Sequence, residues 1–420
     1  MSFLTGLRCI RCNASFPAEP RFDGCPRCRA KAPSNLTPVY DYAAIRRAFR
    51  KEALRDRPAS LWRYREFLPA DPSEASSLGE GMTPLVPCPK LGAELGVPRL
   101  YLKDESRNPT GSFKDRLAVV ALALAGRFGK KTVGVSSTGN AGAAAAAYSA
   151  RMGLPCVVLT VKGAASAMVT QIRAYGALAV ATAKKEDRWT LLQAAVERFG
   201  WYPTSPFFGP PIGSNCYGVE GYKTIAFEVC EQLGWRAPDW CVLPVAYGDA
   251  LFGTWKGFDE FAGMGFVASR PRMAAAETAG SLEAALRDGV DAIPARTPPS
   301  PSFSGSIDVA QSTYQALFAL RASGGLASLV ANEEIMELQE ALASREGMYA
   351  EPSALAALAA VRRLRAQEKI REDDLVVGVM TAAGLKDSAA TAFRQKEVPV
   401  VPADLEALLD ALRASYGYQA

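Results

Sequence analysis

A lysine in a short glycine-containing loop is the residue of this sequence best suited to covalent chemistry. It is Lys114, in the segment NPTGSFKDR at residues 108–116, between a predicted strand and a long helical pattern. We expect Ser112 to cap that helix and Asp115 to lie in its first turn. The positive helix end and partial burial disfavour a further cation, which biases the Lys114 amine toward the neutral nucleophile that a Schiff base requires. The competing interpretation is a solvated lysine.

A second loop strengthens the functional interpretation. Residues 136–140, Ser-Ser-Thr-Gly-Asn, follow the next predicted strand. Gly139 permits a close approach of the backbone, and the amides of such a loop can bind a carboxylate. Two such loops at the ends of neighbouring strands predict a site for a small molecule.

Four of the nine cysteines form two CxxC pairs, Cys9 with Cys12 and Cys25 with Cys28. Each pair places two thiolates on one tight turn. Four sulfurs at about 2.3 Å complete a tetrahedral zinc site and leave no position for water, so the predicted zinc is structural. The alternative is four incidental buried cysteines.

The composition excludes several classes of function. The sequence contains no histidine, which excludes Ser-His-Asp and Cys-His catalysis and histidine-ligated metals. The 48 basic and 43 acidic residues give a net charge of +5 without a long run of one sign, so we expect no nucleic-acid partner. No stretch approaches ~20 apolar residues and no apolar signal core follows Met1, so we expect no membrane partner and a cytoplasmic protein.

Alternating strand and helix patterns would position the two loops. Short β-branched runs are followed by longer, alanine-rich helical patterns, and the second half of the chain repeats this order. The predicted strands are residues 100–103, 132–135, 156–160, 241–245, 273–276 and 375–380. Such alternation predicts an α/β fold with parallel sheets covered by helices, in which loops at the strand ends carry the chemistry.

These motifs make the chain resemble threonine synthases and their relatives among the fold-type-II pyridoxal-phosphate (PLP) enzymes. The resemblance extends from the cysteine pairs to the region of Asp387, and NPTGSFKDR and STGN are its most specific segments. It implies two open twisted-sheet domains with the cofactor between them, a small N-terminal zinc ribbon with four cysteine ligands, and a homodimer. The predicted limits are 1–40 for the ribbon, 41–125 and 205–400 for the large PLP domain with its N-terminal extension, 126–204 for the smaller α/β domain and 401–420 for a C-terminal helix.

The resemblance also implies roles for individual residues. Lys114 would hold PLP as a Schiff base and act as the base for the α-proton, Asn140 would bond the phenolic oxygen, and Phe113 would pack beside the ring. Thr381 would face the pyridine nitrogen, where a neutral hydroxyl favours elimination and replacement over transamination. The substrate carboxylate would be held by Ser137, Thr138, Gly139 and Asn140.

One loop departs from the family pattern. Residues 244–251, PVAYGDAL, replace the glycine-asparagine loop that cradles the cofactor phosphate. Because a carboxylate beside a phosphate is repulsive, we expect Asp249 to cap a helix from Ala250 with its carboxylate turned away, leaving the Gly248 and Ala250 amides for the phosphate. The implied cofactor contacts are Ala246, Tyr247, Gly248, Asp249 and Ala250.

The substrate-phosphate positions of threonine synthases also differ, because Ala141, Gly213 and Gly218 occupy them. Losing several charge-assisted contacts of about 1.5–3 kcal/mol each weakens phosphate binding by orders of magnitude unless other cations substitute. The candidates for substitution are Arg107, Arg116 and Lys162.

The sequence therefore favours a PLP-dependent lyase or synthase of the threonine-synthase-like kind. We expect β- or γ-elimination or replacement on a small amino acid other than O-phosphohomoserine. One alternative is a genuine threonine synthase, which converts O-phospho-L-homoserine and water into L-threonine and phosphate. The other is a catalytically silent zinc-ribbon protein that uses the cleft as a binding module.

Overall fold

The computed structural model describes residues 2–298 and 302–419. Two compact units are distinguished, Met1–Asp387 and Ser388–Ala420, and each is described by itself. The predicted domain limits include residues 1, 299–301 and 420, which lie outside the described residues, and the limits themselves stay a prediction. In the described part of the chain, none of the helices has the length and apolar character of a membrane span.

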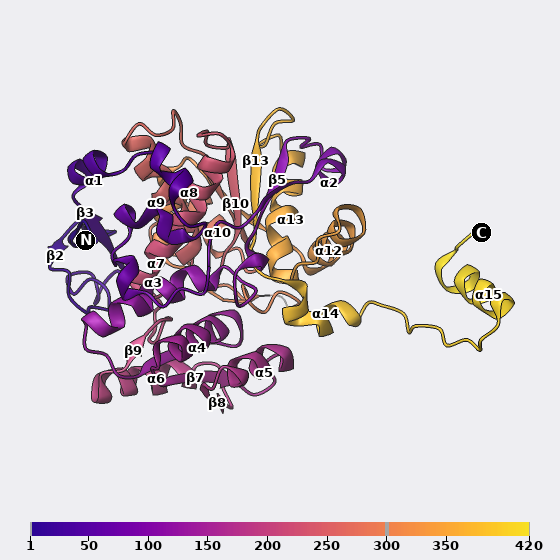
Figure 1. The fold of residues 1–420 in the computed structure, drawn as a ribbon, viewed down its shortest axis with the longest axis horizontal. Coiled ribbons are helices and arrows are strands. Elements are labelled where there is room, and N and C mark those ends of the chain that lie inside the picture. The colour runs from indigo at the N-terminus through magenta and orange to yellow at the C-terminus, as the bar shows by residue number, and fades with distance from the viewer. Residues whose placement is uncertain (1, 299–301, 420) are drawn as a thin grey trace. The chain divides into compact units, whose positions relative to one another are not determined.

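The first unit begins with a small antiparallel sheet in the order β2-β1-β3. Figure 1 labels β2 and β3 of this sheet beside the N-terminus. Its strands are β1 (Leu4–Cys9), β2 (Ser15–Phe16) and β3 (Leu36–Tyr40). Helix α1 (Tyr42–Ala48) follows, and the side chain of Asp41 caps it by accepting a hydrogen bond from the Ala44 amide. Short 3₁₀ helices at Glu52–Asp56, Leu61–Phe67 and Pro72–Glu74 then lead to the larger sheet.

A six-stranded sheet has the order β12-β11-β10-β13-β5-β4. Neighbouring strands are parallel except for the antiparallel pair of β4 and β5, so the predicted parallel sheet is confirmed. The strands are β4 (Leu85–Pro87), β5 (Leu100–Asp104), β10 (Trp240–Pro244), β11 (Arg272–Glu277), β12 (Leu326–Leu329) and β13 (Val376–Met380).

Side chains alternate between the two faces of this sheet, because successive residues of a strand point in opposite directions. Val242 and Val376 belong to a buried cluster with one set of helices, whereas Cys241 and Val377 belong to a cluster with another set. The first set is α2 (Pro89–Glu94), α12 (Asn332–Glu346) and α13 (Pro352–Ala366). The second includes α3 (Lys114–Arg127), α7 (Cys216–Val219), α8 (Lys223–Gln232), α9 (Asp249–Gly263), α10 (Ser281–Arg287) and α11 (Tyr314–Ala322).

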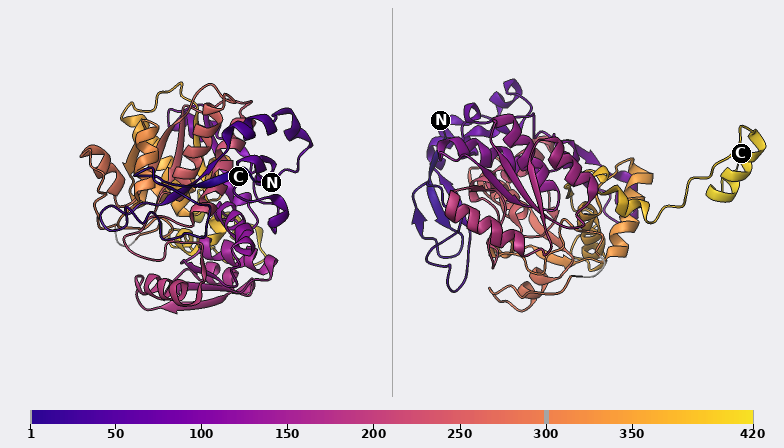
Figure 2. Two further views of the ribbon diagram at one scale, coloured as in Figure 1. Left: turned by 90° about the vertical axis from the view of Figure 1, so that its left-hand side faces the viewer. Right: turned by 90° about the horizontal axis from the view of Figure 1, so that it is seen from below.

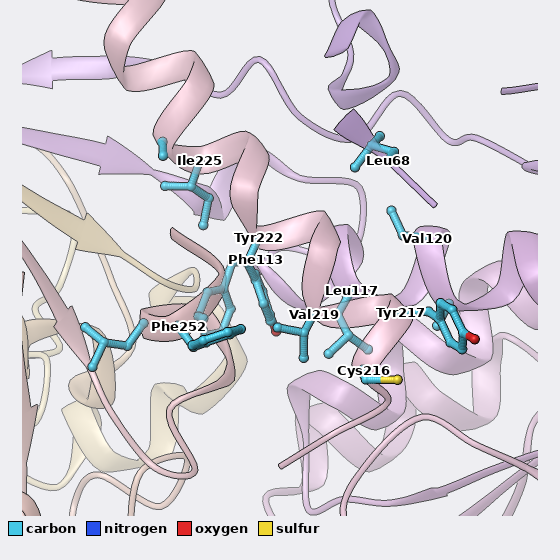
Figure 3. Packing of buried hydrophobic residues seen from close by; sticks show 14 of the residues in the cluster. Leu68, Phe113, Leu117, Val120, Cys216, Tyr217, Val219, Tyr222, Ile225 and Phe252 are labelled. Atoms are coloured by element: carbon cyan, nitrogen blue, oxygen red, sulfur yellow. The ribbon is translucent and has the colours of Figure 1, made fainter. Parts of the chain in front are cut away.

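Helix α3 is buried along most of its length in the second cluster. Every residue from Asp115 to Ala125 is buried. Figure 3 shows Leu117 beside Val219, with Phe113 next to Tyr222, whose ring centroids are 5.2 Å apart. The apolar run after Lys114 therefore fixes the start of α3, and with it the position of the lysine.

A second, four-stranded parallel sheet has the order β8-β7-β6-β9. Its strands are β6 (Val133–Ser136), β7 (Cys156–Val161), β8 (Leu178–Thr182) and β9 (Tyr202–Pro203). Helices α4 (Asn140–Met152), α5 (Ser166–Ala174) and α6 (Asp187–Phe199) accompany it, and α4 packs on α3 (Figure 1, Figure 2). The two sheets of the predicted fold are therefore present.

The second unit contains the helices α14 (Ser388–Ala392) and α15 (Leu405–Tyr416). The side chain of Asp404 caps α15 by accepting a hydrogen bond of 2.8 Å from the Ala407 amide. Helix α15 lies within the range 401–420 that was predicted as a C-terminal helix.

Candidate active site

The loops that follow four strands converge on one pocket in the first unit. These are the loop after β5 that contains Lys114, the loop after β6, the loop after β10 and the end of β13. They enclose a cavity of about 150 Å³. All residues predicted for cofactor and substrate line it: Phe113, Lys114, Ser137, Thr138, Gly139, Asn140, Ala246, Tyr247, Gly248, Asp249, Ala250 and Thr381.

Lys114 is half-buried at the first position of α3 and faces this cavity. Its Nζ lies 4.7 Å from the centroid of the Phe113 ring and 5.7 Å from that of Tyr222. Burial lowers the pKa of the amine below its ordinary value, while the negative charges of Asp249 and Glu351 oppose the shift. The environment thus favours the neutral nucleophile expected from the sequence.

The loop before Lys114 is held against the end of β13. The Phe113 amide donates a hydrogen bond of 2.9 Å to the Thr381 carbonyl, and the Ala383 amide donates one of 3.0 Å to the Gly111 carbonyl. The expected cap by Ser112 is wrong: Phe113 is the N-cap residue, and no side chain caps the helix. Buried Ser112 instead pairs its backbone with residue 382 in an isolated β-bridge.

Asp115 stabilises the same loop from inside the helix. Its carboxylate accepts hydrogen bonds from the Thr110 amide at 2.7 Å and from the Thr110 hydroxyl at 2.6 Å. Burial raises the pKa of Asp115 to about 7. Asp115 therefore lies in the first turn, as expected, but it bonds the preceding loop.

The loop after β6 is shaped by one side-chain bond and one close approach. The Ser137 hydroxyl accepts a hydrogen bond of 3.1 Å from the Gly139 amide. A Cβ at Gly139 would lie 1.9 Å from Sδ of Met168, so a larger residue here would have to displace the methionine side chain or the loop. Asn140 begins α4 and directs its side chain into the pocket wall, where Nδ2 donates a hydrogen bond of 2.8 Å to Oε2 of Glu351.

Glu351 is a pocket residue that the sequence did not reveal. It immediately precedes Pro352 at the start of α13, and only 2% of it is exposed. Burial raises its pKa, against the effects of hydrogen bonds from Asn140 and Ser306. A glutamate before proline signals a helix start. Nothing in that signal places the carboxylate in a pocket.

The loop after β10 corrects the expectation for Asp249. Helix α9 begins at Asp249 instead of Ala250, Gly248 is its N-cap residue with a φ of 76°, and no side chain caps it. The Asp249 carboxylate accepts hydrogen bonds from the Ser214 amide at 2.8 Å, the Ser214 hydroxyl at 2.7 Å and Nε2 of Gln315 at 2.5 Å. These donors compensate a negative charge that would otherwise repel a phosphate.

Close packing explains two of the substituted phosphate positions. Gly213 has a φ of 116°, and a Cβ there would lie 2.2 Å from Nε2 of Gln315 and 2.7 Å from Oδ1 of Asp249. At Gly218 a Cβ would lie 2.9 Å from Cγ of Leu117. Neither position has room for a polar side chain.

None of the three predicted substitute cations lines the pocket. Arg116 is fully buried, and its Nε and Nη1 pair with Glu105 and Glu228 at 2.6 and 2.5 Å. Arg107 is exposed and lies 3.4 Å from a carboxylate oxygen of Asp104, and Lys162 is exposed. The cations that do line the pocket besides Lys114 are Lys185 and Arg188, which lie in a charged segment without any sequence signal for a site.

The two CxxC pairs come together at the small N-terminal sheet. The four Sγ atoms lie within 4.8 Å of one another. Sγ of Cys9 is 3.8 Å from that of Cys28, and Sγ of Cys12 is 3.7 Å from that of Cys25. These separations agree with the ~3.8 Å edge of a tetrahedron with zinc-sulfur bonds of about 2.3 Å.

Comparison with known proteins identifies the class of this pocket. Residues 76–382 match the family of pyridoxal-phosphate-dependent enzymes. The threonine synthase of Methanocaldococcus jannaschii is 36% identical over 97% of this chain and 99% of its own length. The threonine synthase of Methanosarcina acetivorans is 34% identical over 97% of this chain and 98% of its own length.

Solved structures agree on the fold. Maize serine racemase superposes with a TM-score of 0.62 at 22% identity, over 74% of this chain and 90% of that one. Diaminopropionate ammonia lyase from Escherichia coli superposes with a TM-score of 0.63 at 18% identity, over 77% of this chain and 94% of that one. The chain therefore belongs to the fold-type-II PLP-dependent enzymes and, within them, to the threonine-synthase-like family.

These findings confirm a PLP-dependent lyase or synthase. An amino-acid substrate is consistent with this family. The alternative of a catalytically silent binding module has no support in the comparisons. They contradict the expectation of a substrate other than O-phosphohomoserine. Threonine synthases that match 97% of this chain favour the alternative, a genuine threonine synthase. The expectation was wrong because it equated three lost side chains with a lost phosphate site.

Proposed function

We propose that this protein is a threonine synthase, which converts O-phospho-L-homoserine and water into L-threonine and phosphate. The observation that carries the proposal is the similarity to threonine synthases along 97% of the chain, at 36% identity. The pocket supports it, because the residues predicted for a cofactor, a base and a carboxylate all line the same cavity.

The residues of the pocket fit PLP. Lys114 offers an amine with a lowered pKa. Nδ2 of Asn140 donates to Glu351, and its Oδ1, buried without a hydrogen-bond partner among the described residues, can accept from a phenolic hydroxyl. Gly248 presents the N-terminus of the fifteen-residue helix α9, and a Cβ there would lie 2.2 Å from Cβ of Ala316. The glycine is therefore required by packing against Ala316, and the free amides of the helix N-terminus suit a phosphate group.

Each residue then has a role toward the cofactor. Lys114 would hold PLP covalently, Phe113 would pack beside its ring, Asn140 would bond its phenolic oxygen and Thr381 would face its pyridine nitrogen. The cofactor phosphate would be held by the backbone of Ala246, Tyr247, Gly248, Asp249 and Ala250.

The remaining chemistry belongs to the chain. When bound, PLP supplies an electron sink for negative charge at the substrate α-carbon. Lys114 would move the α-proton, because it is an amine inside the pocket with a lowered pKa and the sequence has no histidine. The amides and hydroxyls of Ser137, Thr138, Gly139 and Asn140 would orient the substrate carboxylate.

The cysteine cluster supports a structural zinc ion bound by Cys9, Cys12, Cys25 and Cys28. Backbone amides of Arg11 and Cys12 donate to Sγ of Cys9 at 3.4 Å, which favours a thiolate. Four sulfur ligands leave no open position, so this metal would take no part in the reaction.

Compartment, assembly and domain limits complete the proposal. None of the nine cysteines forms a disulfide, which supports a reducing compartment such as the cytoplasm. The homodimer rests on the resemblance alone, and sedimentation of the purified protein tests it. For the domains we keep the limits 1–40, 41–125 with 205–400, 126–204 and 401–420.

The proposal is tested by incubating the purified enzyme and PLP with O-phospho-L-homoserine. We expect inorganic phosphate and L-threonine in equal amounts, and neither product from Lys114→Ala. Phosphate without threonine, or no phosphate at all, would refute the proposed function.

A further inference from the structure

Arg188 is a buried cation of the pocket wall without an anionic partner. It lies in the first turn of α6, lines the cavity and is 6% exposed. Its Nε donates a hydrogen bond of 3.0 Å to the Lys185 carbonyl. Among the residues that the structure describes, no carboxylate forms an ion pair with it and neither Nη atom makes a hydrogen bond.

This position is electrostatically costly for an arginine. Burial lowers the pKa of the guanidinium, and the Coulombic effects of Tyr247 and Glu186 only partly oppose this shift. The positive end of the α6 dipole adds to the cost. Buried charges in proteins are normally paired, and a guanidinium offers a planar fork of donors that matches a phosphate. An anion that enters the cavity would therefore find an unpaired cation there.

The other charged side chains that line the pocket do not supply an anionic partner for Arg188. The Asp249 and Glu351 carboxylates already accept hydrogen bonds from Ser214, Gln315 and Asn140. Lys185 donates from Nζ to the Asp308 carbonyl at 2.7 Å. Oδ1 of Asp308 is buried without a hydrogen-bond partner in the described part of the chain, so Arg188 does not pair with it there.

We propose that Arg188 binds the phosphate monoester of the substrate, and this inference rests on the proposed function. The contact would replace those lost at Ala141, Gly213 and Gly218 by moving the substrate-phosphate site onto α6. The cofactor carries the same chemical group, which we assign to the N-terminus of α9 at Gly248, and Arg188 is close enough to the preceding residue, Tyr247, to interact with it electrostatically. The experiment therefore has to distinguish the two phosphates.

The test compares Arg188→Gln with Arg198→Gln, which removes an exposed arginine of the same helix away from the pocket. For each holoenzyme we would measure the KM for O-phospho-L-homoserine, the affinity for inorganic phosphate by calorimetry, the affinity for L-threonine and the retention of PLP on dialysis. Losing a bidentate charge-assisted contact should raise the KM and weaken phosphate binding by roughly 100-fold.

We expect those two changes in Arg188→Gln alone, with L-threonine affinity and PLP retention unchanged in both variants. Loss of PLP with an unchanged KM would assign Arg188 to the cofactor and overturn the inference. An unchanged KM with unchanged PLP retention would also overturn it. If Arg188→Gln does not fold, Arg188→Lys keeps the charge, loses the fork and should show a smaller change of the same kind. A wild-type enzyme that releases no phosphate would instead refute the proposed function.

Discussion

At the scale of single residues, the space around Gly139 decides the shape of the carboxylate loop. Its absent Cβ would lie 1.9 Å from Sδ of Met168, so Gly139→Ala must displace the loop or the methionine. Because a displacement of about 1 Å can cost 100-fold in rate, we expect kcat/KM for O-phospho-L-homoserine to fall by roughly 100-fold. Steady-state kinetics of phosphate release measures this.

Two further variants control this prediction. Gly126→Ala changes a helical glycine with nothing within 4 Å of the added Cβ, and it should keep wild-type kinetics. Gly139→Ala with Met168→Ala removes the clash and should recover part of the lost rate. Wild-type kinetics for Gly139→Ala alone would contradict the steric argument.

The titration of Asp115 predicts a pH dependence of stability. Burial raises its pKa to about 7 from the ordinary value of 3.8. Between these two pH values, folded Asp115 keeps a proton that the unfolded chain releases. Its stabilising contribution is therefore complete below about pH 4 and is lost as the pH rises to about 7.

Asp115→Asn removes this titration. We expect the free energy of unfolding of the wild type, minus that of the variant, to fall by up to about 4 kcal/mol between pH 4 and pH 7. Urea unfolding at a series of pH values gives this difference. A difference independent of pH would show that Asp115 does not titrate in this range.

At the scale of elements, a buried ion cluster holds α3 to its neighbours. Arg116 pairs with Glu105 and Glu228, and Lys103 also lies 2.7 Å from Glu228. All four side chains are fully buried. Arg116 therefore positions the helix that carries Lys114. It is not available for the substrate-phosphate contact that the sequence suggested for it.

Removing this arginine leaves Glu105 without its cationic partner and Glu228 with Lys103 alone. We expect Arg116→Met to lower the free energy of unfolding by about 3–5 kcal/mol, the usual cost of an uncompensated buried charge. Arg47→Met, at an exposed position of α1, should change it by less than about 0.5 kcal/mol. Equal stability of the two variants by denaturant unfolding would argue against the cluster as a main support of α3.

The strands that could be predicted from the sequence are the buried ones. The strands β6, β7, β10, β11 and β13 are largely buried and consist mainly of apolar residues, a pattern that predicts parallel strands, and β5 begins with the apolar residues 100–102. Edge strands carry a weaker pattern: residues Leu178 and Val180 of β8 are exposed, and neither β8 nor β12 was predicted. The loop motifs then placed the pocket, because parallel strands end at the same edge of a sheet.

The rest of the site depended on contacts between distant segments. Lys114 and Asn140 belong to local motifs and were predicted, whereas Glu351 and Arg188 reach the pocket only through the tertiary fold. The Asp249 cap was predicted from its local sequence alone. Its actual partners, Ser214 and Gln315, lie 35 and 66 residues away in the chain.

At the scale of the whole molecule, the N-terminal ribbon contacts the supports of the pocket. Nδ2 of Asn35 donates to the Ser214 carbonyl at 3.0 Å and lies 3.4 Å from Oε1 of Gln315, and both residues bond Asp249. Loss of the ribbon would therefore loosen the helix start that we assign to the cofactor phosphate.

Removing the metal tests this connection. We expect one zinc ion per chain by elemental analysis, and chelation should lower both the melting temperature and the retention of PLP. Cys88→Ala, a buried cysteine outside the cluster, should keep one zinc per chain. Purified protein that neither contains nor takes up zinc would contradict the assignment of the four cysteines.

The most direct test of the central claim, that the pocket is a PLP site built on Lys114, is borohydride reduction of the purified holoenzyme followed by peptide mapping. We predict a phosphopyridoxyl group on Lys114 and on no other lysine. A label on Lys185, the other lysine that lines the pocket, or a protein that cannot be labelled after reconstitution with PLP, would contradict it.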